Sequence, residues 1–159
     1  MSTDTPTYSE WQRDGFTVST DPARLDVAAI HRFLAASYWA ADIPYGVVER
    51  SLRHSLNFGV YLGREQIGLA RMITDRATFA YLCDVYILEA WRRRGLAKWL
   101  MTCVMAHPDL QGLRRFNLVT RDAHPLYRQF GFVTPPRPEG YLEKLDREVY
   151  KRAAALRNS

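Results

Sequence analysis

The sequence has few cysteines and no long apolar run. Among its 159 residues only Cys83 and Cys103 are cysteine, and each lies within an apolar segment. A secreted disulfide scaffold carries more cysteines, set in loops, so we expect two buried, reduced thiols. No segment approaches the roughly 20 apolar residues of a membrane span, and the polar N-terminus does not resemble a signal peptide. We therefore expect a soluble, cytoplasmic protein with no membrane partner.

Lysine is also scarce, because Lys98, Lys144 and Lys151 are the only lysines and the net charge of +5 rests on arginine. A basic charge of this size allows a polyanionic partner without requiring one. Apolar residues make up 47% of the chain, which excludes a disordered or fibrous protein. No His, Cys, Asp and Glu residues show metal-ligand spacing, so we expect no metal.

Hydrophobic periodicity predicts alternating strands and helices over most of the chain. The expected strands cover residues 16–20, 58–62, 67–73, 79–88, 115–120 and 141–145. The expected helices cover residues 27–37, 47–56, 96–104 and 125–130, and the last has Gly131 as its C-terminal cap. Residues 1–14 are expected to form a loose arm and residues 146–159 a charged helical tail. The pattern predicts a single α/β or α+β domain over residues 1–159.

The segment most informative about function covers residues 82–97, LCDVYILEAWRRRGLA. It joins an apolar strand to the start of a helix through a basic turn with one glycine. The N–H groups and the positive end of the helix dipole favour anions, and Arg92, Arg93 and Arg94 add charge there. Gly95 allows a ligand to approach the backbone closely, and a pyrophosphate would suit this site. The segment contains neither a P-loop nor a GxGxxG fingerprint.

Arg92, Gly95 and Ala97 match the [RQ]-x-x-G-x-[GA] loop that binds acetyl-CoA in one large family. About thirty residues later, LYRQFGF (residues 126–132) is similar to the LYxxxGF motif of the same family. The sequence therefore resembles the GCN5-related N-acetyltransferases (GNAT), over roughly residues 16–145. This resemblance implies a mixed, mostly antiparallel sheet with splayed central strands and helices on both faces.

The resemblance also implies where acetyl-CoA, the acetyl donor and co-substrate, would bind. The backbones of Val85, Tyr86 and Ile87 would pair with the pantetheine arm. The loop and first helical turn would hold the pyrophosphate, with the residues Arg92, Arg93, Arg94, Gly95, Leu96, Ala97 and Lys98. Thr120 stands where the family often has Asn, which puts the cofactor contact at this position in doubt.

The expected reaction is direct acetyl transfer to a primary amine of a small molecule or a peptide in a ternary complex. Tyr127, in the LYxxxGF motif, would protonate the departing thiolate. Backbone N–H groups of the splayed strand would stabilise the oxyanion. No protein nucleophile is needed, and Cys83 is expected to be inert because strand cysteines are usually buried.

Asp84 is the only charged residue between Ala77 and Leu88. A buried carboxylate without a partner is costly, so two interpretations stay open. It forms a structural hydrogen bond to a neighbouring strand or to an arginine such as Arg71, or it faces the acceptor and holds the amine or relays its proton. We include Asp84 among the catalytic candidates, and Arg71 and Asp84 among the candidates for binding the substrate.

In this family the first two helices and their loop recognise the acceptor. Here the loop contains Tyr38, Trp39, Asp42 and Tyr45, an aromatic and acidic group suited to a cationic amine. The aromatic rings could equally pack the helices against the sheet. Two other function classes remain: an acyl-CoA sensor without turnover, and a basic nucleic-acid-binding module. We expect no nucleic-acid partner, because no recognition helix or aromatic sheet pattern is legible. A homodimer is possible.

Overall fold

The computed structural model describes residues 7–157. These residues form two compact units: residues 7–26 with 51–119, and residues 27–50 with 120–157. The first unit contains the whole sheet, and the second contains helices and loops. Residues 1–6 of the predicted arm and residues 158–159 of the predicted tail lie outside the described residues.

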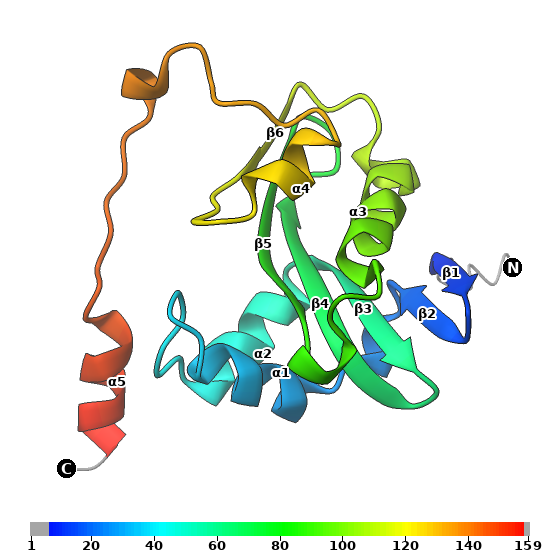
Figure 1. The fold of residues 1–159 in the computed structure, drawn as a ribbon. Coiled ribbons are helices and arrows are strands. Elements are labelled where there is room, and N and C mark those ends of the chain that lie inside the picture. The colour runs from blue at the N-terminus through cyan, green and yellow to red at the C-terminus, as the bar shows by residue number, and fades with distance from the viewer. Residues whose placement is uncertain (1–6, 158–159) are drawn as a thin grey trace, which may run out of the picture. The chain divides into compact units, whose positions relative to one another are not determined.

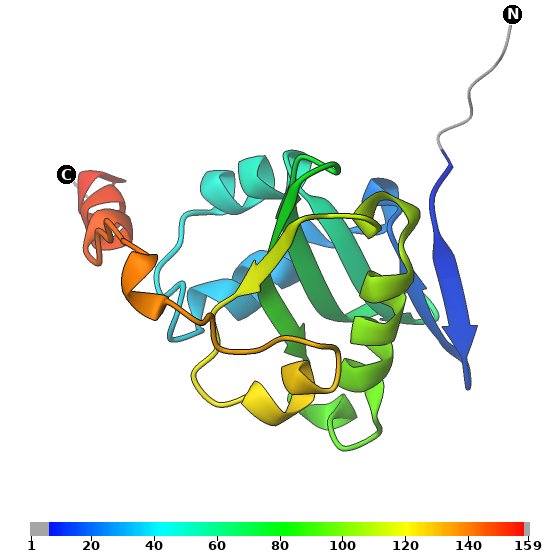
Figure 2. The same cartoon turned by 90° about the horizontal axis from the view of Figure 1, so that it is seen from above.

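A six-stranded sheet forms the first unit, and its strands lie side by side in the order of the chain (Figures 1 and 2). Its strands are β1 (Glu10–Arg13), β2 (Phe16–Ser19), β3 (Leu56–Leu62), β4 (Glu65–Thr74), β5 (Phe79–Ile87) and β6 (Arg115–Leu118). Successive strands from β1 to β5 are antiparallel, and β6 is parallel to β5. The predicted mixed, mostly antiparallel sheet is confirmed.

The predicted hairpin over residues 58–73 is confirmed as β3 and β4. Gly63, at φ +58°, adopts the left-handed backbone that the turn between them needs. Apolar side chains fill both strands, and Phe58, Val60, Ile67, Leu69 and Met72 are completely buried. Such nearly continuous apolar strands are typical of the centre of a sheet.

Residues 7–157 form five α-helices: α1 (Val27–Ala35), α2 (Tyr45–Arg53), α3 (Leu96–Ala106), α4 (His124–Arg128) and α5 (Val149–Arg157). Short 3₁₀ turns cover Pro22–Arg24, Glu89–Trp91, Pro108–Leu110 and Pro138–Gly140. The apolar face of α3, which includes Leu96, Leu100 and Val104, is buried, and the helix contacts β3 and β5. Pro108 follows its end, as its sequence predicts.

Several predictions about local structure are wrong. Residues 10–13 of the expected loose arm form β1, because Asp14 and Gly15 form a tight turn and Trp11 stacks on Phe58. Leu56 belongs to β3 and not to the second helix, which ends at Arg53. Residues 141–145 form no strand, because they pair with no strand in the described part of the chain.

The pairing of β5 with β6 covers only part of β5. The parallel ladder runs from Phe79–Arg115 to Leu82–Leu118, whereas β5 continues to Ile87. On its other side β5 keeps pairing with β4 as far as Ile87, opposite Gly68. A Cβ atom at Gly68 would lie 2.7 Å from the backbone oxygen of Tyr86, so a glycine is needed for this close approach. The second half of β5 thus lies outside the β5–β6 ladder, as expected for splayed strands.

Tyr61 in β3 gives a test of core packing. Its side chain is 1% exposed, its hydroxyl has no hydrogen-bond partner among the described residues, and Arg24 lies 4.3 Å from its ring centroid. Tyr61→Phe keeps the ring and removes the unsatisfied hydroxyl. We expect the free energy of unfolding in urea to rise by about 1 kcal/mol. Tyr8→Phe, at an exposed tyrosine, is the control and should change nothing. A clear loss of stability in Tyr61→Phe would mean that the hydroxyl is hydrogen-bonded, for instance to water.

Candidate active site

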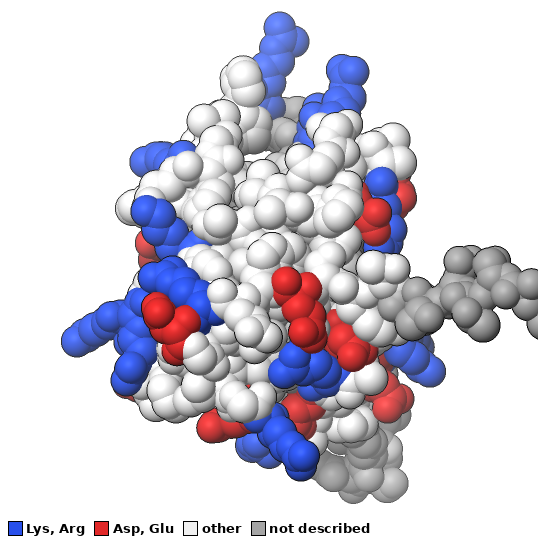
Figure 3. All heavy atoms as spheres, turned by 90° about the vertical axis from the view of Figure 1, so that its right-hand side faces the viewer, with Lys and Arg blue, Asp and Glu red and all other residues white. Residues whose placement is uncertain are grey.

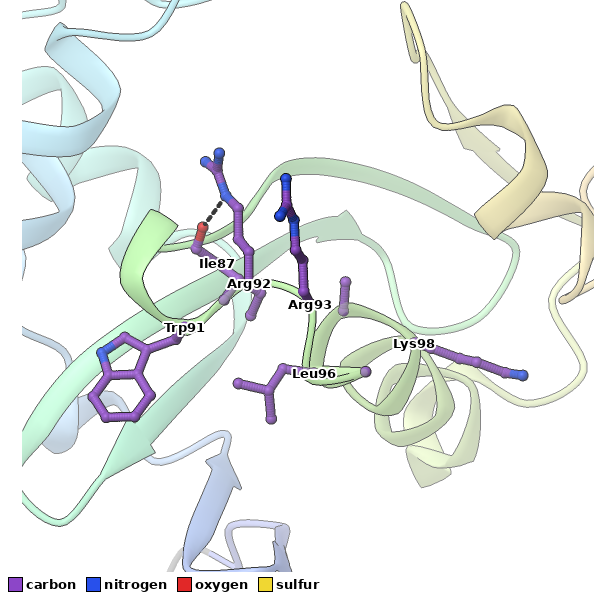
Figure 4. Close-up of a pocket in the computed structure, with 8 residues that line it drawn as sticks. Ile87, Trp91, Arg92, Arg93, Leu96 and Lys98 are labelled. Atoms are coloured by element: carbon purple, nitrogen blue, oxygen red, sulfur yellow. Dashed lines mark hydrogen bonds between the residues drawn. The ribbon is translucent and has the colours of Figure 1, made fainter.

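A basic pocket lies where β5 leads into α3. The 3₁₀ turn Glu89–Trp91 and the turn at residues 92–95 connect the two elements. The pocket is open to solvent, and its empty volume is about 340 Å³ when the open side is included. Its lining residues are Ile87, Trp91, Arg92, Arg93, Gly95, Leu96, Ala97 and Lys98 (Figure 4). A pocket of this size suits part of a cofactor, such as a diphosphate.

The backbone of the turn is held in an unusual conformation. Arg93 (φ +65°) and Gly95 (φ +74°) are both left-handed, and Gly95 forms the N-cap of α3. Arg92 Nε donates a hydrogen bond of 2.9 Å to the backbone oxygen of Ile87, which fixes this side chain against the end of β5. Figure 4 shows the side chains of Arg92 and Arg93 extending to the same side of the turn.

The predicted phosphate-binding residues are largely brought together here. Arg92, Arg93, Gly95, Leu96, Ala97 and Lys98 line one pocket, with Ile87 from the end of β5. Arg94 is not a lining residue, and its guanidinium lies 5.1 Å from the ring centroid of Trp91. Trp91 does line the pocket, and the sequence analysis missed it. Its position just before the three arginines was the available signal.

A bulge interrupts β5 at Asp84, the charged residue of this apolar strand. Leu69 pairs with Tyr86 and Arg71 with Cys83, so Ala70 of β4 faces both Asp84 and Val85. Asp84 adopts φ +51°, a left-handed conformation that Asp tolerates better than most residues. A bulge of this kind bends the strand and re-aims the groups that follow it. The charge in this apolar strand therefore coincides with a local change in backbone direction.

Arg71 holds Asp84 in this position. Arg71 Nε donates to Asp84 Oδ2 at 2.8 Å, and Arg71 Nη1 donates to Ser55 Oγ at 3.0 Å. The side chains of Arg71 and Asp84 are only 16% and 10% exposed. The pairing considered from the sequence is confirmed. Burial raises the pKa of the Cys83 thiol to about 12, so this neighbour is protonated and a poor nucleophile at neutral pH.

Tyr127 and Thr120 belong to the second unit. Tyr127 lies in α4, is 8% exposed and contacts the ring of Phe132 edge-on at 6.1 Å. Burial, together with the charge of Asp122, raises the pKa of Tyr127. The helix ends at Arg128 with Gln129 as its C-cap, so the predicted cap at Gly131 is wrong. Gly131 (φ +89°) lies in the turn that follows, where Phe132 N donates to Tyr127 O. Thr120 Oγ1 accepts from Ala123 N at 3.0 Å, so this hydroxyl organises the start of α4.

The predicted acceptor group lies in the same unit as Tyr127, around the loop between α1 and α2. Tyr38 and Trp39 are 60% and 42% exposed, with ring centroids 5.1 Å apart. Asp42 is exposed at φ +65°. Arg121, which the sequence analysis missed, lies 3.8 Å from the ring centroid of Tyr38.

Tyr45, the other aromatic residue of this predicted group, contacts the ring of His31 at 5.4 Å. His31 in turn donates from Nε2 to the backbone oxygen of Ile43. The ring of Tyr38 therefore already has a cation, Arg121, over one of its faces. Recognition of the acceptor by this group stays a prediction.

The rest of the described chain adds two observations. Within residues 7–157 no group of three or more His, Cys, Asp and Glu side chains is placed to hold a metal ion, and no helix there is long and apolar enough to cross a membrane. Figure 3 shows one face of the molecule, on which Lys and Arg side chains are interspersed with Asp and Glu.

The sequence profile of the acetyltransferase (GNAT) domain matches residues 54–134, which include β3 to β6, the basic pocket and α4. A "putative acetyltransferase" of Gibberella zeae is 39% identical over 140 residues, which cover 74% of this chain and 78% of that protein. A crystal structure from Xanthomonas campestris pv. campestris, described as a "putative acetyltransferase belonging to the gnat family", superposes with a TM-score of 0.83. It is 50% identical and covers 85% of this chain and 96% of its own.

A more distant structure shares the fold. The GNAT acetyltransferase of Elizabethkingia anophelis, solved with acetyl-CoA bound, has a TM-score of 0.60 at 13% identity, with 85% of this chain and 90% of that chain covered. The matched profile, the identity to the G. zeae protein and the superposed structures agree. The chain belongs to the GCN5-related N-acetyltransferase family.

Proposed function

We propose that the protein is an N-acetyltransferase that moves the acetyl group of acetyl-CoA directly to a primary amine of a small molecule or peptide. The observation that carries this proposal is the basic pocket at the β5–α3 junction, next to the half of β5 that lies outside the β5–β6 ladder. Such a junction can take the phosphates in the pocket and an extended arm along the strand.

The charges of the pocket fit the diphosphate of the cofactor. Arg92, Arg93 and Lys98 line it, and within residues 7–157 none of them forms an ion pair with a carboxylate. Gathering cations without counter-charges is unfavourable, and a bound diphosphate would offset it. The N-terminus of α3 adds N–H groups for the same anion. Bound acetyl-CoA supplies the acetyl thioester; the protein supplies its position.

The second half of β5 supports the placement of the acyl end. We assign the backbones of Val85, Tyr86 and Ile87 to the pantetheine arm, because the parallel ladder with β6 ends before them. The bulge at Asp84 changes the direction of the N–H groups at this point of the strand. A backbone N–H placed there would stabilise the negative charge that develops on the carbonyl oxygen.

One side chain, Tyr127, is assigned to proton transfer, and Asp84 is assigned to positioning. The amine nitrogen forms its bond to the acetyl carbon, the carbon–sulfur bond breaks, and the sulfur leaves as a thiolate that needs a proton. Tyr127 would give that proton, and its raised pKa keeps the phenol protonated at neutral pH. The proton that the amine loses passes to solvent. Because Arg71 already holds Asp84, we assign Asp84 to the position of the bulge and the amine rather than to proton transfer.

The acceptor is assigned to the loop between α1 and α2 by the exposed rings of Tyr38 and Trp39 and the carboxylate of Asp42. Arg121 over Tyr38 adds a cation to this group, which suits an amine whose molecule also carries a carboxylate. An assay of CoA thiol release with a panel of polyamines, amino acids and peptides tests this assignment. The proposal fails if no amine in the panel releases thiol.

Binding of the donor gives a direct measurement. We expect acetyl-CoA at about 100 times its dissociation constant to raise the free energy of unfolding by about 2.7 kcal/mol. For a domain of this size that corresponds to an increase in Tm of about 5–10 °C. Acetylpantetheine, which lacks the nucleotide, should give a much smaller shift.

Thermal protection also separates the other two function classes. Protection by acetyl-CoA without thiol release for any amine would favour an acyl-CoA sensor of the same fold. The absence of protection would contradict both the enzyme and the sensor, and would leave the nucleic-acid-binding module.

A further inference from the structure

The N-terminal hairpin ends next to the basic pocket. Arg13 is the last residue of β1 and pairs with Phe16, the first residue of β2. The two residues between them, Asp14 (φ +51°) and Gly15 (φ +84°), are both left-handed. Two-residue turns of this type match the twist of a hairpin and fix its register. The position of Arg13 is therefore set by the turn.

Two contacts attach this end of the hairpin to the pocket. Phe16 meets the ring of Trp91 edge-on, with centroids 5.9 Å apart. Arg13 Nη2 lies 3.8 Å from the place where a Cβ atom of Gly95 would stand. Trp91 and Gly95 are both lining residues of the pocket. The guanidinium of Arg13 thus lies against the turn that holds the phosphate site, although it comes from a strand far away in the sequence.

The charge of Arg13 is not neutralised by the fold. Its one ion pair among the described residues is with the adjacent Asp14, at 3.6 Å, and the two side chains are 48% and 82% exposed. Exposed ion pairs of this kind contribute little to stability. Arg13 therefore adds another cation beside the pocket that Arg92, Arg93 and Lys98 line, where it increases the attraction for an anion with several charges.

We propose that Arg13 is a further binding residue for the phosphates of the cofactor's nucleotide end; this inference rests on the proposed function. Coenzyme A carries a diphosphate and a separate 3′-phosphate. Arg13 lies beside Gly95 but outside the pocket lining, which suits a phosphate oxygen at the edge of the pocket. The planar guanidinium can donate two parallel hydrogen bonds to such a group. Strand β1, which the sequence predicts as part of a loose arm, then becomes part of the donor site.

The test compares Arg13→Gln with the wild-type protein by calorimetric titration of CoA and of dephospho-CoA. Arg13→Gln should weaken CoA binding about three- to tenfold, and the difference should shrink at high ionic strength. An equal loss with both ligands assigns Arg13 to the diphosphate; a loss with CoA alone assigns it to the 3′-phosphate. Arg13→Lys should restore part of the affinity.

Arg64→Gln, at an exposed arginine in the β3–β4 turn, is the matched control and should bind like the wild type. Unchanged Tm values of the unliganded variants would show that the hairpin is intact. Unchanged CoA affinity in Arg13→Gln overturns this inference and leaves the proposed function standing. Failure of the wild-type protein to bind CoA overturns the proposed function itself.

Discussion

Tyr127→Phe should lower kcat by about 10²- to 10⁴-fold, the usual contribution of a positioned general acid. The substitution keeps the ring and its edge contact with Phe132, so the fold should be preserved. The KM for acetyl-CoA should change little, because the phenol acts when the thiolate leaves. Initial rates of thiol release, measured with saturating amine, check this result.

Two controls make the Tyr127→Phe result specific. Tyr141→Phe, at an exposed tyrosine, should leave kcat unchanged. The raised pKa of Tyr127 also means that its phenol stays protonated in the neutral range and above it. At any pH below about 10, the wild-type rate should therefore show no decrease caused by ionisation of this group. A Tyr127→Phe protein with normal kcat would remove Tyr127 from the mechanism.

Arg71→Met should cost about 3 kcal/mol of unfolding free energy, because it leaves the Asp84 carboxylate in a site that is only 10% exposed. The corresponding fall in Tm is about 6–12 °C. Asp84→Asn should cost less, because Asn tolerates the left-handed backbone and can still accept from Arg71. Urea unfolding of the two single variants and the double variant gives the coupling between the two side chains.

The outcome of this cycle separates the roles of Asp84. Coupled stability losses together with a raised acceptor KM in Asp84→Asn would support the positioning role. Additive losses would contradict a direct interaction between Arg71 and Asp84. Normal kcat and acceptor KM in Asp84→Asn would leave the pair with a purely structural role.

The parts of the site that depend on short stretches of sequence could be predicted. The loop at residues 92–97 combines arginines, a glycine and the start of an amphipathic helix, and the structure brings most of these residues to one pocket. The hairpin of β3 and β4 is also encoded by adjacent residues. In these cases the local pattern and the tertiary structure favour the same conformation.

The bulge at Asp84 could not be predicted in the same way. It depends on how β5 is aligned with β4, where Leu69 and Arg71 pair with residues three positions apart, Tyr86 and Cys83. The exclusion of residues 141–145 from the sheet has a similar cause, since their apolar character suits a strand but no strand lies beside them. Pairing between strands, and not the local sequence alone, decides both features.

The short strand β1 could have been predicted. Asp14–Gly15 is among the strongest local signals for a hairpin, and Trp11 gives the preceding residues an apolar anchor. The loose-arm interpretation gave too much weight to the polar residues around them. The contact of Arg13 with the pocket is different, because it follows only from the way the hairpin packs on Trp91.

The left-handed residue in β5 also has a consequence for aggregation. A strand that extends beyond its neighbour has an unpaired edge with regularly spaced N–H and C=O groups. Such an edge can pair with a strand of another protein chain. Here the bulge falls where the β5–β6 ladder has ended, and it breaks that regular spacing. A regular strand of another chain that paired with β5 would lose its register at Asp84. The backbone distortion that we place in the proposed donor site therefore also makes this strand a poor seed for edge-to-edge assembly.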